Sequence, residues 1–440
     1  MGTCLSEPIT AMVIERARAD TLDSACVTMQ GWRRTHEDAH IVVSSVNGEL
    51  AAGTGVFAVL DGHGGQRAAQ VGAKLLREEL VRIARLGVLD PIAAREAHVN
   101  AFFATDKAIR AQVAEEERSG STVVAAIITR VGVTSEYQVQ LAHCGDSRAV
   151  VGRPSNGMGA VLACTEDHKP HRDDEVARIR GAGGHVERGP FGGPMRVDGT
   201  LAVSRSLGDF HFKPHEMDPS KCKVTAMPEV QTFRCRAGDW VLLACDGVFD
   251  VYSNEEVYGF VDGVLQEAHE VLDCGHAMVR LLQASLDRGS KDNCTACLVR
   301  IGVTPQTAAH TMELLSGPWE QAPAEVRAKY ADFYLAHGFK AEAQALCDSP
   351  EAPPRNSAGL ASPAPTSTPA GARPSNDSQG PAAENAANRR AGGLTGGAGA
   401  RQLSAMARAL QAMRSTRAIQ SAWRARRDSA GNAGSETRGS

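Results

Sequence analysis

Acidic residues stand next to short apolar runs at three separated places in the chain. The run VFAVL leads directly into Asp61, the run WVLLAC leads into Asp246, and Asp292 stands just before the run CTACLV. One Asp at a strand end is more often a turn or capping residue, so the joint pattern carries the argument. Clustered carboxylates repel one another unless a hard cation neutralises them, and all-oxygen ligand sets suit Mg²⁺ or Mn²⁺. The pattern predicts a pair of such ions.

A fourth stretch, GWRRTHEDAH, places a cation beside two further acids. It contains Arg33, Glu37 and Asp38 close together at the start of the predicted sheet. After Asp61, the glycines of DGHGG allow backbone and side chains to converge in a tight turn. These residues join the candidate site.

The elements that must position these residues are short β-rich runs alternating with helical stretches between residues 25 and 302. This pattern indicates a mixed α and β domain and not a repeat. Strands are predicted at 56–60, 123–128, 137–142, 149–151 and 240–244, and helices at 66–86, at 93–117 and as a pair within 255–286. A capping box at Ser253 and Glu256 predicts where that pair begins.

Composition and periodicity divide the rest of the chain. Residues 303–347 have a helical pattern and predict a small helical extension. Residues 348–400 are dominated by Pro, Ala, Ser, Gly and Asn, which cannot bury enough apolar area to offset the ordering entropy, so a disordered linker is expected. A basic amphipathic helix is predicted at 401–428, followed by a disordered tail at 429–440.

Charge, hydropathy and cysteine usage narrow the class of protein. The formal net charge of -4 gives no global drive toward nucleic acid, and none is expected as a partner. The chain has neither an apolar run of the roughly 18 residues that a membrane span needs nor a secretory signal pattern. The 11 cysteines are scattered and fit free thiols in a reducing compartment. A cytoplasmic monomer is expected.

Eight phrases, in order along residues 25–302, carry a family resemblance. The chain resembles the metal-dependent protein serine/threonine phosphatases of type 2C in the phrases MQGWRRTHEDAH, VFAVLDGHGG, SGSTVVAAI, AHCGDSRAVV, EDHKPHRDDEVARIRGAGGHV, RVDGTLAVSRSLGDFHFK, VLLACDGVFD and KDNCTACLV. The resemblance implies an α+β fold, a four-layer α-β-β-α sandwich in which two antiparallel β-sheets pack face to face between antiparallel helices. It also implies a leader at 1–24, a catalytic domain at 25–302 and a flap at about 169–195.

The resemblance further implies hydrolysis of phosphoserine and phosphothreonine in phosphoproteins by a metal-bridged hydroxide. Asp61 would bridge two Mg²⁺ or Mn²⁺ ions, Asp246 and Asp292 would complete one, and Glu37 with the Gly62 carbonyl would complete the other. Two close cations can share a water, lower its pKa and neutralise the developing charge.

Supporting roles follow from the same resemblance. Asp38 would act through bound water, Arg33 would orient the phosphate with its planar fork, and His63 would protonate the leaving alkoxide. Asp146, with Asp246 and Asp250, matches a third-metal site of some relatives, although GDSR is also typical of a β-turn. One departure is Asp198, which stands where relatives commonly carry asparagine. The added carboxylate is expected to alter metal affinity or flap docking.

Three alternative functions fit the sequence less well. A cysteine-dependent phosphatase at Cys144 would need an arginine six positions later, where Val150 stands. A catalytically silent scaffold or binding protein with the same fold would be expected to lack metal carboxylates or the phosphate arginine, which this sequence has. A metal-dependent nuclease would be expected to show a basic groove, and the core has no obvious basic run.

Both ends of the chain carry candidate motifs for acylation or binding. Gly2 and Ser6 satisfy the N-myristoylation pattern, and Cys4 is placed to take a palmitoyl group, which predicts membrane association. Within 401–428, the phrase AIQSAWRARR resembles calmodulin-binding IQ motifs, with Ala425 in place of the usual glycine. A calmodulin-like partner, anionic lipid and a solvated tail all remain open for this helix.

Overall fold

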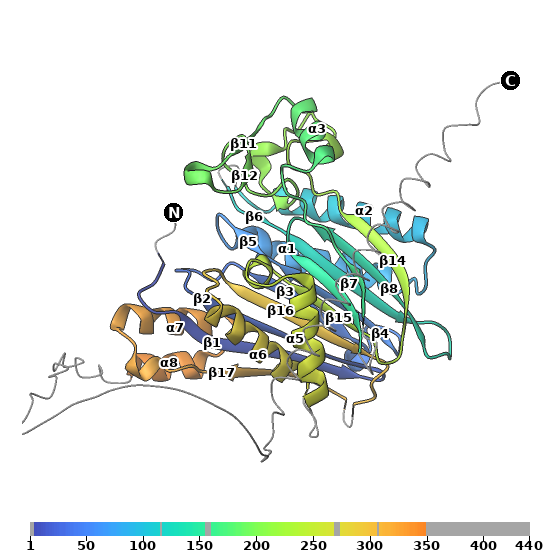
Figure 1. Ribbon diagram of the computed structural model, residues 1–440, viewed down its shortest axis with the longest axis vertical. Helices are drawn as coiled ribbons and strands as arrows, with labels where there is room; N and C mark the ends of the chain where they lie inside the picture. The colour runs from blue at the N-terminus through green and yellow to red at the C-terminus, as the bar shows by residue number, and fades with distance from the viewer. Residues whose placement is uncertain (1–3, 115–116, 155–159, 268–272, 306–307, 349–440) are drawn as a thin grey trace, which may run out of the picture. The chain divides into compact units, whose positions relative to one another are not determined.

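Two antiparallel β-sheets packed face to face form the centre of the computed structural model, which describes residues 4–348 apart from 115–116, 155–159, 268–272 and 306–307 (Figure 1). The larger sheet comprises, in order, β10 (Ala160–Cys164), β9 (Arg148–Arg153), β15 (Trp240–Ala244), β16 (Cys294–Ile301), β2 (Leu22–Gly31), β1 (Ile9–Ala19) and β17 (Ala309–Leu315). The smaller comprises β14 (Glu229–Arg236), β8 (Glu136–Cys144), β7 (Val123–Arg130), β4 (Thr54–Leu60) and β3 (Ala39–Ser44).

Helices cover both outer faces of this pair of sheets (Figure 1). The larger sheet packs against α5 (Asn254–Glu267) and α6 (Cys274–Asp287), and the smaller against α1 (Arg67–Ala84) and α2 (Pro91–Arg110). The predicted four-layer α-β-β-α sandwich is therefore confirmed. The predicted capping box is present too, since the Glu256 N–H donates to Ser253 Oγ at 3.2 Å and the Ser253 N–H donates to Glu256 Oε2 at 2.9 Å.

Apolar side chains from both sheets meet in the layer between them. Phe57 and Val59 of β4 and Val124 of β7 share this core with Leu243 of β15 and Cys297 of β16. Strands buried on both faces read as continuous apolar runs, which is why the sequence reveals them clearly. The sites where these runs end are fixed by the core behind them.

Smaller elements lie at the end of the sandwich where the acidic residues gather. A three-stranded sheet has the order β13 (Leu207–Gly208), β6 (Gly120–Ser121), β5 (Gly62–His63), and the short helix α4 (Asp246–Phe249) follows β15. The expected flap contains α3 (Asp173–Gly181) and the hairpin of β11 (Val186–Arg188) and β12 (Met195–Val197), which stand together at the top of Figure 1.

Two predicted boundaries are wrong. The segment 1–24, expected as a leader, contains β1, which pairs with β2 and β17, so the domain begins before residue 25. The charged side chains of β1 obscured the strand pattern in the sequence, because such residues are compatible with a buried strand only when they have charged partners. Glu15 accepts a hydrogen bond from His40 at 2.7 Å, and Arg16 pairs with Asp273 at 2.8 Å. Likewise α2 ends at Arg110 and not at the expected residue 117.

The extension at 303–347 is only partly helical. It opens with β17 and continues with α7 (Ala324–Ala336) and α8 (Lys340–Asp348). Tyr330 and Phe333 of α7 share a core with Ile9 and Val13 of β1, so this extension packs as part of the sandwich domain. Of the linker expected at 348–400, only Asp348 is described, and it ends α8. Gly2, the rest of that linker and the expected segments at 401–428 and 429–440 lie outside the described residues. Within the described part of the chain, no helix is long and apolar enough to cross a membrane.

Two truncations test this organisation. A chain ending at Asp348 is expected to unfold at the same urea concentration as the full chain and to keep its activity. A chain ending at Gly302 lacks β17, α7 and α8, and one face of β1 becomes exposed to solvent. Its free energy of unfolding should fall by several kcal/mol, because each large buried side chain contributes about 1.5–3 kcal/mol. Equal urea midpoints for all three chains would contradict the shared core.

Candidate active site

Carboxylates from both sheets converge at one end of the sandwich. Asp61 follows β4, Asp146 lies just after β8, and Asp246 begins α4 just after β15. One carboxylate oxygen from each lies within 4.8 Å of the others. The sequence predicted Asp61 and Asp246 from their places after apolar runs, and the packing of the two sheets is what brings those strand ends together.

Asp292 and Arg33 lie beside this carboxylate cluster. The Arg33 guanidinium donates a hydrogen bond to the Asp292 carboxylate, and the Arg33 side chain is half-exposed. Burial lowers the pKa of Arg33, but Asp292, Asp246 and Asp61 outweigh it and leave the pKa raised. The guanidinium therefore lies in the field of the whole acidic cluster while it remains accessible to a ligand.

Glu37 approaches the cluster because the chain passes unusually close to Gly62. A Cβ atom at Gly62 would lie 2.2 Å from the Glu37 carbonyl oxygen, so only glycine fits there. The Gly65 N–H donates to Glu37 Oε2 at 3.0 Å, and the Thr35 hydroxyl donates to Oε1 at 2.8 Å. These bonds hold the Glu37 carboxylate beside the Gly62 turn. This position is the one that the prediction requires, in which Glu37 and the Gly62 carbonyl bind the same ion.

Asp38 is buried with one oxygen satisfied and one not. Thr295 Oγ1 donates to Asp38 Oδ2 at 2.6 Å, whereas Asp38 Oδ1 is buried without a partner among the described residues. Burial raises the pKa of Asp38 to about 7. An unsatisfied buried carboxylate oxygen is costly, and a metal-bound water is a group that could satisfy it.

Crowding of charge dominates the electrostatics of the cluster. Burial raises the pKa of Asp61, and Asp246 and Asp38 raise it further. The pKa of Asp246 is raised by burial and then by Asp146 and Asp292. Partly buried carboxylates this close need a compensating cation, and oxygen donors fit Mg²⁺ or Mn²⁺ better than Zn²⁺. The residues present fit the expected binuclear site.

The predicted third-metal residues are also close to the cluster. Burial raises the pKa of Asp250, and the nearby Asp146 and Asp292 carboxylates add to that shift. In this structure the Lys169 ammonium pairs with Asp146. A third ion at Asp146 and the Lys169 ammonium would therefore compete for the same carboxylate.

His63 lies on β5 with its ring turned toward a buried acid. Its Nε2–H donates to Asp209 Oδ2 at 2.8 Å. The sequence singled out His63 but missed Asp209, which lies in the SLGDF phrase.

Asn293 is a second residue that sequence reasoning left without a role. Its Oδ1 accepts from the Glu37 N–H at 2.9 Å, and its Nδ2 donates to the Gln30 and Thr35 carbonyl oxygens at 2.7 and 3.1 Å. One side chain thereby fixes the loop that carries both Arg33 and Glu37. Its position directly after Asp292 was the available signal.

Asp198 acts within the flap and not on the metal cluster. It has φ of 46°, its Oδ1 accepts from the His185 N–H at 2.9 Å, and its Oδ2 pairs with Lys223 at 2.7 Å. Of the two effects expected for this added carboxylate, the contacts favour flap docking.

A second group of possible ligands, His143, His168 and Glu229, does not suit a metal. The two imidazole rings are stacked with an interplanar angle of 14°. Ring-nitrogen lone pairs lie in the ring planes, so parallel rings cannot aim them at one ion. Arg172 also donates to Glu229 at 2.6 Å, and the Gly145 N–H donates to His168 Nδ1 at 3.1 Å. This group is a hydrogen-bonded network in which the charge of Glu229 is paired with Arg172.

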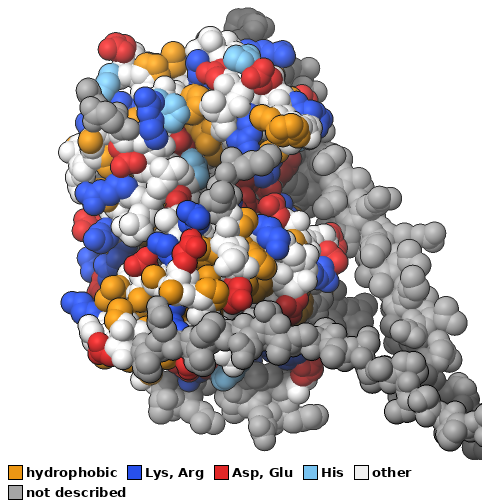
Figure 2. Space-filling view, turned by 90° about the vertical axis from the view of Figure 1, so that its left-hand side faces the viewer, with side chains coloured by type: hydrophobic (Ala, Val, Ile, Leu, Met, Phe, Trp, Pro, Cys, Tyr) orange, Lys and Arg blue, Asp and Glu red, His pale blue; other side chains and the backbone are white. Residues whose placement is uncertain are grey.

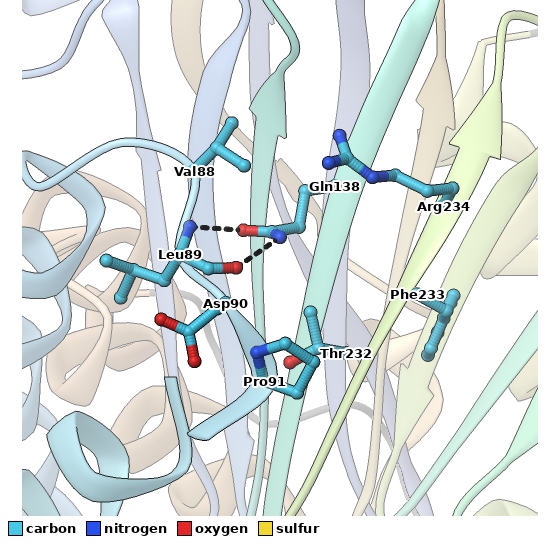
Figure 3. A pocket seen from close by; sticks show the side chains of 8 residues that line it. All are labelled: Val88, Leu89, Asp90, Pro91, Gln138, Thr232, Phe233 and Arg234. Atoms are coloured by element: carbon cyan, nitrogen blue, oxygen red, sulfur yellow. Dashed lines mark hydrogen bonds between the residues drawn. The ribbon is translucent and has the colours of Figure 1, made fainter. Parts of the chain in front are cut away.

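A surface hollow beside the smaller sheet contains none of the acidic site residues. Figure 3 shows it between β8, β14 and the segment that precedes α2. The Gln138 amide exchanges two hydrogen bonds with the Leu89 backbone there, at 2.9 and 2.6 Å. Figure 2 shows acidic and basic side chains interspersed over the visible face. Concavity therefore does not locate the site, whereas the converging carboxylates do.

An α-β-β-α sandwich with an acidic cluster and an arginine at one end defines a class of metal-dependent hydrolase. Residues 22–294 match the family model described as protein phosphatase 2C. The chain belongs to the protein phosphatase 2C family and is a metal-dependent serine/threonine phosphoprotein phosphatase.

Relatives and solved structures agree with this assignment. The chain is 39% identical to "Probable protein phosphatase 1N" of Mus musculus over 68% of this chain and 70% of that protein. It is 32% identical to "Protein phosphatase 2C homolog 2" of Aspergillus flavus over 68% of each. A crystal structure of a phosphatase from Toxoplasma gondii superposes with a TM-score of 0.58 at 26% identity, covering 69% of this chain and 99% of that one.

Removing one carboxylate should have opposite effects with and without metal. In EDTA, Asp246→Asn is expected to raise the free energy of unfolding by on the order of 1 kcal/mol or more, because it relieves repulsion. Mn²⁺ at a hundred times its dissociation constant should stabilise the wild type by about 2.7 kcal/mol and the variant far less. Urea unfolding measures both effects.

The matched control for this experiment is Asp332→Asn, an exposed carboxylate on α7 that pairs only with Lys329 among the described contacts. It should respond to EDTA and Mn²⁺ as the wild type does. If Asp246→Asn kept the full Mn²⁺ stabilisation, Asp246 would not be a ligand.

Proposed function

We propose that this chain hydrolyses phosphoserine and phosphothreonine with Asp61, Asp246, Asp292, Glu37 and the Gly62 carbonyl holding two Mg²⁺ or Mn²⁺ ions. The observation that carries the proposal is the convergence of buried and partly buried carboxylates beside an accessible Arg33. When bound, the ions would activate a water for attack on phosphorus and neutralise the charge that develops there.

The chain's own residues bind and orient the phosphomonoester in this proposal. Arg33 has the planar fork that matches two phosphate oxygens, and its nearness to Asp292 places the phosphate against the metal ligands. Asp38 accepts a hydrogen bond from water through its unsatisfied Oδ1. His63 donates a proton to the departing serine or threonine oxygen, which is a poor leaving group as an alkoxide.

A catalytically silent scaffold with the same fold is the less favoured alternative. It would not need the costly arrangement of several buried carboxylates with raised pKa values around one point. Retention of that arrangement together with Arg33 supports catalysis.

Two substitutions separate the proposed roles. Asp61→Asn should abolish metal-dependent phosphate release from a phosphothreonine peptide, because it removes a ligand shared by both ions. Arg33→Ala should lower kcat/KM by roughly 100-fold through lost orientation, with a rise in KM. Arg34→Ala, which removes the neighbouring exposed guanidinium paired with Glu325, is the matched control and should have little effect.

Full activity in Asp61→Asn would overturn the metal assignment. No release by the wild type with Mn²⁺ or Mg²⁺ would instead favour the scaffold.

Membrane association through Gly2 and Cys4 is the second part of the proposal. The described chain begins with an exposed Cys4, and the next residue is already anchored, because the Leu5 N–H donates to the Trp32 carbonyl at 2.9 Å. Trp32 immediately precedes Arg33, so acyl chains would hold the membrane close to the segment that carries Arg33. Since one myristoyl chain binds marginally, Cys4 acylation or a basic helix at 401–428 would supply the second contact, to lipid or to a calmodulin-like protein.

Gly2→Ala should move the protein from the membrane fraction to the soluble fraction of expressing cells, because it removes the acceptor amine for myristate. Cys4→Ser should weaken attachment less. Thr3→Ala keeps the acylation pattern and serves as the control. Unchanged membrane recovery of Gly2→Ala would show that the N-terminus is not the anchor.

A further inference from the structure

In the small sheet β13-β6-β5, two segments that are far apart in the sequence pair with the same residue, Gly120. Gly120 of β6 is paired with His63 of β5 on one side and with Gly208 of β13 on the other. Asp209 directly follows Gly208, so this sheet places Asp209 and His63 on either side of Gly120.

Gly120 leaves the space that the two side chains use to meet. A Cβ atom at this position would lie 2.1 Å from Asp209 Oδ2 and 2.4 Å from His63 Nε2. With no side chain between them, the His63 Nε2–H donates to Asp209 Oδ2 at 2.8 Å. The contact therefore depends on three residues from three strands or their ends.

The Asp209 carboxylate is held in one orientation. Its side chain is 2% exposed, and the Ser206 hydroxyl donates to Oδ2 at 2.6 Å. Its backbone has φ of 51°, an uncommon conformation for a residue other than glycine, and its N–H donates to the Ser119 carbonyl at 3.0 Å. A residue kept at such a φ with its carboxylate buried is consistent with a functional constraint.

The segment that carries Asp209 is braced against α2. Asp106 of α2 accepts hydrogen bonds from the Gly208 N–H at 2.8 Å and from Lys213 Nζ at 3.0 Å. Lys213 Nζ also donates to the Ser206 carbonyl at 2.8 Å. Since Lys213 and Asp106 are both buried, the segment is fixed to the helix on both sides of Asp209.

We propose that Asp209 is a positioning residue that holds His63 with Nε2–H turned inward, so that Nδ1 is the nitrogen presented to the leaving oxygen. This inference rests on the proposed function, in which His63 is the proton donor. As the bond from phosphorus to the serine or threonine oxygen breaks, its electron pair stays on that oxygen and the Nδ1 proton is transferred to it. The attacking water oxygen forms the new bond to phosphorus and releases one proton to solvent, and Nδ1 regains a proton from solvent before the next turnover.

A purely structural role for the His63–Asp209 contact makes a different prediction. If the contact only stabilised the small sheet, its loss would slow all substrates alike. If it positions the proton donor, its loss should matter for an alkoxide leaving group and much less for p-nitrophenolate, which departs without protonation. The ratio of kcat values for a phosphothreonine peptide and p-nitrophenyl phosphate therefore separates the two roles.

The test uses the full chain with saturating Mn²⁺ and two variants, of which one removes the charge behind the contact and the other separates the two partners. Asp209→Asn removes the negative charge that holds the His63 Nε2–H, while it keeps a side chain that tolerates positive φ and can still accept from Ser206. Gly120→Ala keeps both partners and separates them with a methyl group. General acid catalysis contributes about 10²–10⁴-fold, so each variant should lower the peptide to p-nitrophenyl phosphate ratio at least tenfold.

Gly259→Ala is the matched control for the glycine substitution, because nothing lies within 4 Å of the added methyl in α5. It should keep the wild-type ratio. If Asp209→Asn does not fold by circular dichroism, Asp209→Gly replaces it, since glycine takes a positive φ without strain.

His63→Asn and the double variant His63→Asn/Asp209→Asn complete the experiment. If Asp209 acts through His63, Asp209→Asn should lower the ratio no further once His63 is replaced. Equal losses on both substrates, or additive losses in the double variant, would overturn the positioning role. If His63→Asn itself left the ratio unchanged, the proposed role of His63 would be the part that failed.

Discussion

The repulsion among carboxylates at the shared end of the two sheets is the constraint on which the rest of the structure depends. Asp61, Asp146 and Asp246 bring oxygens within 4.8 Å of one another. Burial raises the pKa of Asp61, and the nearby Asp38 and Asp292 carboxylates raise it further. A flexible chain would relieve this repulsion by moving apart. The cluster persists because each carboxylate is tied to a rigid element, and a metal-dependent hydrolase gains a preorganised cation site from that rigidity.

The sandwich supplies the rigidity in two ways. Its apolar layer fixes the ends of β4 and β15, while polar side chains at the edge fix the loops between them. Asn293 holds the segment that carries Arg33 and Glu37, and the glycine at position 62 lets two backbones approach. The N- and C-terminal parts of the domain close one core through β1 and α7, at the side where Cys4 begins the described chain.

Local patterns predicted what depends on local chemistry. The apolar runs that end at Asp61 and Asp246 predicted two strands, because a strand buried on both faces is apolar throughout. The acidic residue directly after each run was then easily recognised as a candidate ligand. β1 was missed because Arg16 is compatible with a strand only through Asp273 and Glu313, each more than 250 residues away along the chain. Asp209 was missed for the same reason, since its partner His63 lies 146 residues away and the contact needs a third strand to form.

These carboxylates should form a site for two divalent cations. Equilibrium dialysis of the metal-free full chain against Mn²⁺, with bound metal counted per chain, tests this. We expect two tightly bound ions in the wild type and a loss of tight binding in Asp61→Asn, because the proposed site assigns that carboxylate to both ions. No tight Mn²⁺ binding by the wild type, or two ions still bound tightly by Asp61→Asn, would contradict it.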